Sequence, residues 1–289
     1  MSSGPGVGPM KSLTILTANV GYGFAGMDHL ALSVKHQLHI HGWGALAYLF
    51  CPPLFRECGK ISRSRRVAYV LKNKNLGSTE EMISRTQPDV LVLNELIYEL
   101  YGAEVETYLG QQGFQAIGWG ISSHYPGTSI STLVAVKSGG ELISCSMPQR
   151  PSIGGGAGMT GIRLAGRSQS VFGVHLTYRS PALFLQQIRY IARMAADEKA
   201  RGNEVVIAGD WNESVSTITA NSDFRSLGLM TGASRQHLTC PTFFPRFLRS
   251  SLDHVFVPNG WRQVRSDAIA FGSDHLALAV EVHPASSVK

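Results

Sequence analysis

The residues best suited to chemistry in this sequence stand at the ends of apolar segments that have the composition of strands. Residues 205–208 (VVIA) are followed by Gly209-Asp210-Trp211-Asn212. If the extended geometry continues, Asp210 and Asn212 lie on one side of the chain, because alternate residues of a strand share a face. Such a carboxylate–amide pair can hold a hard cation or a polarised water and can hydrogen-bond a phosphate oxygen. Asp and Asn also favour Asx-rich turns, so this motif alone leaves both interpretations open.

Other polar side chains share this placement at the end, or the start, of an apolar segment. They are Asn19, Glu95, His175, Asp253 and the pair Asp274-His275. Glu95 closes the segment DVLVLNE, a pattern expected of a metal ligand at a sheet edge. His175 lies inside the segment GVHLT, where a histidine is also common as a core residue with satisfied hydrogen bonds. Strands often begin and end in polar residues, so each of these signals stays open when it is taken alone.

The elements that must position these residues are short strands with few helices between them. The S-x-x-E pattern of Ser78 and Glu81 predicts a capping box and a helix to about Thr86. Pro181, with apolar residues at 185, 188, 191, 192 and 195, predicts a helix over 181–201, and a further helix is expected over 101–112. Strands are expected at 11–19, 89–93, 114–118, 131–137, 141–147, 161–164, 170–177, 204–208, 253–257, 264–270 and 276–282. Many of these strands follow one another directly, which predicts an α/β protein with a layered, largely antiparallel sheet.

The composition is that of an ordinary globular protein. The chain has 289 residues, of which 44% are hydrophobic and 16% charged, and this excludes a disordered chain. The formal net charge of +6 favours a phosphate-bearing substrate, since a basic surface concentrates anions. None of the four cysteines forms a CxxC pair, so neither a zinc knuckle nor a thioredoxin-type site is indicated.

The order of the motifs, rather than any one of them, carries a resemblance. The series strand–Asn, strand–Asn-Glu, strand–His, strand–Gly-Asp-x-Asn, Leu-Asp-His-strand and Ser-Asp-His-strand resembles the endonuclease/exonuclease/phosphatase superfamily from Asn19 to His275. That superfamily includes DNase I-like nucleases, neutral sphingomyelinases and inositol-polyphosphate 5-phosphatases. The resemblance implies a four-layer α/β sandwich of the DNase I-like type, in which two facing mixed sheets are flanked by helices. It also implies an active site at one edge of the two sheets.

The resemblance also implies roles for individual residues. The implied metal ligands are Asn19, Glu95 and Asp274, and the ion would be Mg²⁺, with Mn²⁺ as a substitute. The implied catalytic residues are His175, Asp210, Asn212, Asp253 and His275. The implied substrate-binding residues are Asn19, Asn212 and His175. In this scheme Asp253 orients His275, which acts as a base or contacts phosphate, while His175 can act as an acid on the leaving oxygen.

The sequence departs from the family pattern in three places. Asn94-Glu95 stands where the family usually has Gln-Glu, which keeps the expected metal ligand. The tryptophan- and arginine-rich signature of inositol 5-phosphatases is absent before Asp253, which argues against that activity. The third departure is an insert at about 28–75, in which an aromatic and apolar run is followed by arginines. It could be an extra helix pair, a substrate lid, a nucleic-acid grip or a membrane-surface element.

The sequence therefore predicts a disordered leader at 1–10 and a single domain over 11–285 with the insert at 28–75. The expected activity is divalent-metal-dependent phosphodiester hydrolysis, of an endonuclease-like kind. The alternatives are a sphingomyelinase-like phosphodiesterase of phospholipid headgroups, a small-molecule phosphatase and a non-catalytic binding module. The expected partner is a nucleic acid or a phospholipid headgroup, with peripheral membrane contact through 43–66. Neither a signal peptide nor a transmembrane span nor an obligate protein partner is indicated.

Overall fold

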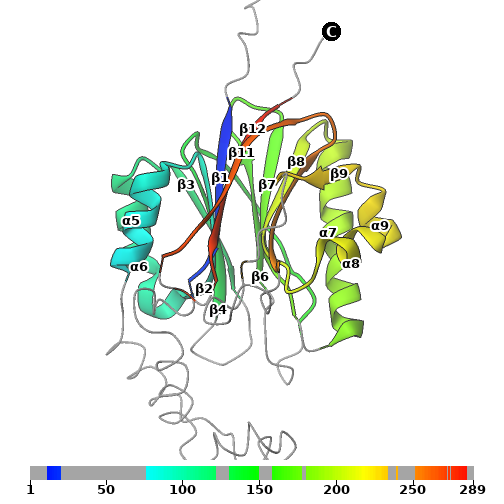
Figure 1. Cartoon of the computed structure of the whole chain (residues 1–289), viewed down its shortest axis with the longest axis horizontal. Helices are drawn as coiled ribbons and strands as arrows, with labels where there is room; N and C mark the ends of the chain where they lie inside the picture. Colours follow the sequence, from blue (N-terminus) through cyan, green and yellow to red (C-terminus); the bar gives the residue numbers. More distant parts are fainter. Residues whose placement is uncertain are drawn as a thin grey trace, which may run out of the picture.

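Two six-stranded sheets lie face to face, and helices cover the outer face of each (Figure 1). The computed structural model describes residues 12–20, 76–121, 130–149, 158–177, 180–233, 239, 251–271, 273 and 275–284. The four layers confirm the α/β sandwich with two facing mixed sheets. The expected leader at 1–10 and the insert at 28–75 lie outside the described residues.

The first sheet has the strand order β11-β12-β1-β2-β4-β3. Its strands are β1 (Leu13–Asn19), β2 (Val90–Ile97), β3 (Ala116–Ile121), β4 (Ile130–Val136), β11 (Arg262–Ile269) and β12 (Ala277–His283). Only β1 and β2 run parallel, with Asn19 beside Asn94, and the other pairs of this sheet are antiparallel. The parallel pair brings the carboxyl ends of β1 and β2 to one edge.

The second sheet has the strand order β5-β6-β7-β8-β10-β9. Its strands are β5 (Gly140–Ile143), β6 (Gly158–Leu164), β7 (Gln169–His175), β8 (Glu204–Asp210), β9 (Leu229–Thr231) and β10 (Asp253–Pro258). Here β7 and β8 form the parallel pair, with His175 beside Asp210. Each sheet therefore has one parallel pair within an otherwise antiparallel arrangement.

Helices flank the two sheets on opposite sides of the molecule (Figure 1). Helices α5 (Gly77–Thr86) and α6 (Tyr98–Gln111) cover the first sheet, while α7 (Pro181–Ala200), α8 (Val215–Ala220) and α9 (Ser222–Arg225) cover the second. Helix α7 begins as its sequence predicts, because the Ser180 hydroxyl accepts a hydrogen bond from Leu183 N and Pro181 occupies the first turn. None of the described helices is long and apolar enough to span a membrane.

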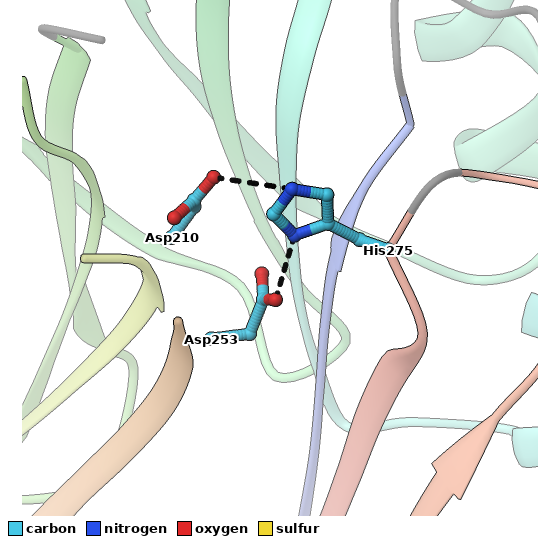
Figure 2. Close-up of side chains that lie close together, drawn as sticks. All are labelled: Asp210, Asp253 and His275. Carbon is cyan, nitrogen blue, oxygen red and sulfur yellow. Dashed lines mark hydrogen bonds and ion pairs between the residues drawn. The ribbon is translucent and has the colours of Figure 1, made fainter. Parts of the chain in front are cut away.

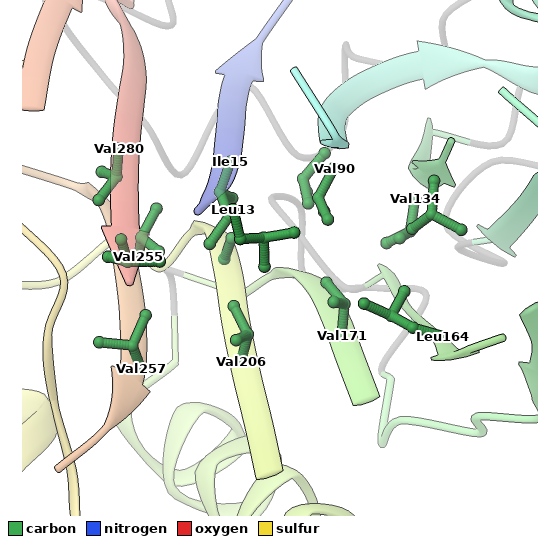
Figure 3. Packing of buried hydrophobic residues seen from close by; sticks show 14 of the residues in the cluster. Leu13, Ile15, Val90, Val134, Leu164, Val171, Val206, Val255, Val257 and Val280 are labelled. Atoms are coloured by element: carbon green, nitrogen blue, oxygen red, sulfur yellow. The ribbon is translucent and has the colours of Figure 1, made fainter. Parts of the chain in front are cut away.

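The core between the sheets consists mainly of β-branched side chains from both sheets (Figure 3). Ile15 and Val134 of the first sheet face Val206 and Val255 of the second. Two further apolar clusters fill the space between each sheet and its helices. Strands such as β2 are buried on both faces, which explains their continuous apolar sequences.

Some local expectations were wrong. Helix α5 starts at Gly77 with Leu76 at its N-cap and no side-chain cap, so Ser78 and Glu81 form no capping box. Leu185 is 44% exposed, because the buried face of α7 passes through Leu183 instead. Helix α6 begins at Tyr98, directly after β2, and β5 ends at Ile143. The sequence pattern did not indicate α8, α9 or β9, because these elements are only three to six residues long.

Candidate active site

Six of the expected site residues meet at one edge of the two facing sheets. Asn19, His175 and Asp210 end the parallel strands β1, β7 and β8, and Glu95 lies near the end of β2. Asp253 begins β10, and His275 lies just before β12. Because β10 and β12 are antiparallel to β8 and β1, the first residues of these late strands reach the edge where the parallel strands end. In Figure 1 this is the lower edge of the two sheets, where β1 (blue) ends.

A buried histidine–carboxylate pair lies at this edge (Figure 2). His275 Nδ1 lies 2.8 Å from Asp253 Oδ2, and the two side chains are 7% and 0% exposed. A carboxylate oxygen can only accept a hydrogen bond, so Nδ1 donates and carries the proton. The other ring nitrogen, Nε2, faces Asp210 Oδ2 at 3.9 Å.

Asp210 is the residue on which the other side chains converge. Its Oδ2 accepts a hydrogen bond of 2.9 Å from Asn19 Nδ2, and its Oδ1 accepts one of 2.9 Å from Asn212 N. The side chain of Asp210 is 1% exposed. These two donors fix the direction in which the carboxylate points.

His175 stands between two carboxylates. Its Nε2 lies 3.8 Å from Glu95 Oε1 and 3.7 Å from Asp210 Oδ2, and its Nδ1 has no hydrogen-bond partner among the described residues. Both distances are too long for a direct hydrogen bond and suit an intervening ligand atom. The side chain of His175 is 3% exposed, whereas that of Glu95 is 22% exposed and faces solvent more openly. His175 is therefore not the satisfied core histidine that its apolar strand could also have held.

A β-bulge directs Glu95 to this edge. Leu93 pairs with Leu133 and Leu96 with Ser131, so Asn94 and Glu95 together oppose one residue of β4. Glu95 has a φ of 62°, a left-handed conformation that non-glycine residues seldom adopt. In a regular strand Asn94 and Glu95 would point to opposite faces. The bulge instead lets Glu95 reach His175 of the second sheet while Asn94 stays buried between the sheets. The alternating pattern of the sequence carried no signal for this bulge.

The turn after β8 is held by hydrogen bonds to two other segments, the end of β7 and the start of β10. Asn212 has a φ of 52°, so the extended geometry does not continue past Asp210, and Asn212 Nδ2 donates to Leu176 O at 2.9 Å. Trp211 N donates to Leu252 O, and His254 Nε2 donates to Glu213 O at 2.8 Å. Burial lowers the pKa of His254, which keeps this ring neutral. This role of His254 was not expected from the sequence, because a histidine inside an apolar strand does not by itself indicate which loop it holds.

Next to the pair of His275 and Asp253, hydrogen bonds of Ser273 connect the segment before β12 to the end of β1. Ser273 Oγ donates to Asn19 O at 2.6 Å and accepts from His275 N at 3.3 Å. These bonds fix His275 next to the end of β1. The neighbouring Asp274 lies outside the described residues, so its expected part in a metal site stays a prediction.

The donor atoms at this edge fit a hard divalent cation. Asp210, Asp253 and His275 each offer one ligand atom, and these atoms lie within 4.8 Å of one another. The hydrogen bond between Asp253 and His275 competes with that grouping, because a shared ion would have to replace it. An ion held by Glu95 and Asp210 instead would leave the bond between Asp253 and His275 intact. The carboxylates of Glu95 and Asp210 lie 3.8 and 3.7 Å from His175 Nε2. Carboxylate oxygens are the ligands that Mg²⁺ and Mn²⁺ prefer.

Comparison with solved structures finds the same fold at low sequence identity. ANGEL2, a 2′,3′-cyclic phosphatase, matches with a TM-score of 0.60 and 15% identity, over 94% of this chain and 95% of that one. The catalytic domain of human nocturnin, with a bound sulfate anion, matches with a TM-score of 0.57 and 16% identity, over 95% and 93%. An endonuclease/exonuclease/phosphatase from Bacteroides vulgatus matches with a TM-score of 0.57 and 13% identity, over 94% and 99%. No curated protein sequence matches the chain.

The sandwich fold is that of the DNase I-like class. The model of the Endonuclease/Exonuclease/phosphatase family matches residues 63–275, which is most of the chain. The chain belongs to this family, whose members hydrolyse phosphoesters and generally use a divalent metal. The family assignment confirms the family that the order of the motifs indicated, and its match includes every motif except the first, at Asn19.

Proposed function

We propose that the protein is a divalent-metal-dependent phosphodiesterase that acts on nucleic acid in the manner of an endonuclease. One observation carries the proposal: Asn19, Glu95, His175, Asp210, Asp253 and His275 converge from six strands or strand ends on one edge. Their chemistry supplies what phosphodiester hydrolysis needs, namely an oriented base, a second imidazole and carboxylates for a cation. The formal net charge of +6 suits a polyanionic substrate.

Glu95 is the first candidate to hold the cation, with Asn19 and Asp274 as the further ligands that the sequence suggests. A bound Mg²⁺ would neutralise charge on the phosphoryl oxygens and polarise the scissile ester. Asn19 Nδ2 already donates to Asp210, so Asn19 also keeps that carboxylate in place. His175 Nε2, between Glu95 and Asp210, is placed to contact a phosphoryl or leaving-group oxygen.

His275 and Asp210 are the groups that would handle the proton of the attacking water. Asp253 accepts the Nδ1 proton of His275, and this leaves the lone pair of that ring on Nε2, which faces Asp210. A water bound near Nε2 and Asp210 Oδ2 could therefore give its proton to either group. Asn212 N holds Asp210 Oδ1, so the other oxygen, Oδ2, is the one that faces the two histidines.

The alternative substrates differ in what surrounds the phosphate. A phospholipid-headgroup phosphodiesterase is favoured by the apolar and basic sequence of residues 43–66, which lies outside the described residues. ANGEL2 is a 2′,3′-cyclic phosphatase, which adds cyclic phosphate ends to the substrates to be tested. A small-molecule phosphatase and a non-catalytic binding module complete the alternatives.

The test is a parallel hydrolysis assay in Mg²⁺, Mn²⁺ or EDTA. Its substrates are supercoiled plasmid, single-stranded RNA, RNA with a 2′,3′-cyclic phosphate end, sphingomyelin vesicles and an aryl phosphomonoester, and the Asp210→Ala variant is the control. We expect EDTA-sensitive cleavage of plasmid or RNA that Asp210→Ala lacks. Headgroup release without nucleic-acid cleavage would replace the nuclease by the lipid enzyme. Turnover of none of the substrates would favour the binding module, and full activity of Asp210→Ala would overturn the site.

A further inference from the structure

Asn94 joins the two sheets at the centre of the site. Its side chain is fully buried, and three hydrogen bonds satisfy its amide when the oxygen faces the second sheet. In that orientation the oxygen accepts from Asp210 N at 2.9 Å, while the nitrogen donates to Val174 O at 3.1 Å and to Thr132 Oγ1 at 3.0 Å. One amide thus contacts β4 of its own sheet and both parallel strands of the opposite sheet.

The residues next to these contacts are the ones that carry the chemistry. Glu95 follows Asn94 in the bulge, and His175 follows Val174 at the end of β7. The third partner is the backbone N–H of Asp210 itself. Glu95 belongs to the first sheet, whereas His175 and Asp210 belong to the second. Asn94 is therefore a direct link between the two halves of the candidate active site.

The sheets approach closely around this link, so the length of the side chain matters. A Cβ atom at Gly173 of β7 would lie 2.4 Å from Val134 Cγ2 and 3.1 Å from Val92 Cγ1, both of the first sheet. Gly173 directly precedes Val174, whose carbonyl oxygen Asn94 contacts. An additional methylene at position 94 would have to push the sheets apart or break one of the three bonds.

We propose that Asn94 is a positioning residue, which sets the placement of Glu95 against Asp210 and His175 through the backbones of β7 and β8. This inference rests on the proposed function, because it assigns Asn94 to the hydrolytic site. Its effect is expected in turnover and in metal activation, since the side-chain hydrogen bonds of Asn94 go to Thr132, Val174 and Asp210 and not to the residues assigned to the substrate. A displacement of about 1 Å at reacting groups is enough to reduce turnover about 100-fold.

The test compares Asn94→Leu, Asn94→Gln and a matched control, Thr132→Val. Asn94→Leu has a similar shape but removes all three bonds, and Asn94→Gln keeps the amide but lengthens it. Thr132→Val removes the bond within the first sheet and keeps both bonds to the second. We expect kcat to fall about 100-fold in Asn94→Leu and about 10-fold in Asn94→Gln, with KM nearly unchanged. The Mg²⁺ concentration for half-activation should rise in both variants, and Thr132→Val should stay within about threefold of the wild type.

A purely structural role would give another pattern. It would lower the folded fraction, and kcat would then fall while the Mg²⁺ half-activation and the pH–rate profile stayed as in the wild type. In that case, kcat would also fall in Thr132→Val and in Asn94→Leu, in each variant according to its loss of unfolding free energy. Either result would overturn the positioning role.

A readout without turnover separates this inference from the proposed function. Hydrogen exchange at the Asp210 amide, followed by NMR, should accelerate at least tenfold in Asn94→Leu and stay near the wild-type rate in Thr132→Val. If wild-type protein cleaves none of the substrates but this difference is found, the proposed function fails while the link by Asn94 stands. If the Asp210 amide exchanges equally in all variants, the link itself is wrong.

Discussion

At the residue scale, Asp253 determines which ring nitrogen of His275 carries the proton. The carboxylate holds the proton on Nδ1, so that Nε2 can accept one. In Asp253→Asn the amide can present its NH₂ group to Nδ1, and the imidazole proton then moves to Nε2. We expect kcat to fall by about 10²- to 10⁴-fold, with little change in the thermal unfolding midpoint. Steady-state kinetics and circular dichroism would check both expectations, and a variant with undiminished kcat would show that this pair is not the base.

The backbone of Glu95 gives a second prediction at this scale. Its φ of 62° costs about 1 kcal/mol for any residue with a Cβ atom. Glu95→Gly and Glu95→Ala both remove the carboxylate, but only glycine relieves the conformation. We expect the two variants to be equally inactive and Glu95→Gly to be the more stable by roughly 0.5–1 kcal/mol in urea unfolding. Equal stability of the two variants would mean that this conformation carries no strain.

The sequence singled out side chains that the structure brings together, but not the way in which they are held. Asn19, His175, Asp210, Asp253 and His275 stood out because each polar side chain interrupts, ends or precedes an apolar run. Asn94 and His254 belong to the same motifs but were assigned no role, since Asn94 acts through a bulge and His254 through a loop carbonyl. Both depend on neighbours far away in the sequence, which no local pattern records.

At the scale of elements, the close contact between β7 and β8 makes the stability of the protein sensitive to a substitution at Gly209. Gly209 has a φ of 145°, and a Cβ atom there would lie 1.9 Å from Val174 O. We expect Gly209→Ala to destabilise the protein by more than about 2 kcal/mol, because backbone would have to move in the middle of a sheet. Gly166→Ala is the matched control, since its φ of 67° is also positive but its added Cβ meets no atom within 4 Å. It should cost only about 1 kcal/mol in urea unfolding, and an equal cost for both variants would refute the steric argument.

Sequence predicted long elements well and short or irregular ones poorly. Helix α7 was placed to within one residue, because Pro181, an apolar face and Gly202 mark its whole length. Helices α8 and α9 and strand β9 are too short to show a period. The parallel pairing of β1 with β2 and of β7 with β8 could not be derived from strand patterns, which do not specify neighbours. Only the family resemblance predicted the two-sheet arrangement.

At the scale of the whole molecule, an acid-sensitive cluster of polar side chains connects strands β5, β6 and β7 of the second sheet to helix α7. Glu198 of α7 accepts two hydrogen bonds from Arg163 at 2.8 Å and one from Ser170 at 2.7 Å, and Arg163 also pairs with Glu141. The Arg163 guanidinium lowers the pKa of Glu198 from 4.5 to about 2. Because the folded-state pKa is lowered, this stabilisation is present above pH 4.5 and is lost as the pH falls towards 2.

The prediction is a change in the pH dependence of unfolding. Wild-type protein should lose on the order of 2–3 kcal/mol through this group in acid, after allowing for screening at the partly exposed Arg163. Glu198→Gln should be less stable at pH 6 and should show a flatter decline between pH 4.5 and 2. Glu81→Gln, a change at an exposed carboxylate of α5, should follow the wild-type curve. Urea unfolding across this range measures all three, and parallel curves for Glu198→Gln and wild type would contradict the assignment.

The pairing of β1 with β12 has a consequence for the chain during synthesis. Leu13 lies beside Val282, so the first described strand stays unpaired on that side until the last one has been made. His275 arrives with this same late strand, and Asp253 only shortly before it. Until β12 has been made, the chain therefore lacks the pair of His275 and Asp253, and the candidate active site stays incomplete. In refolding, activity should return together with amide protection in β1 and β12, and activity that precedes this protection would contradict the order.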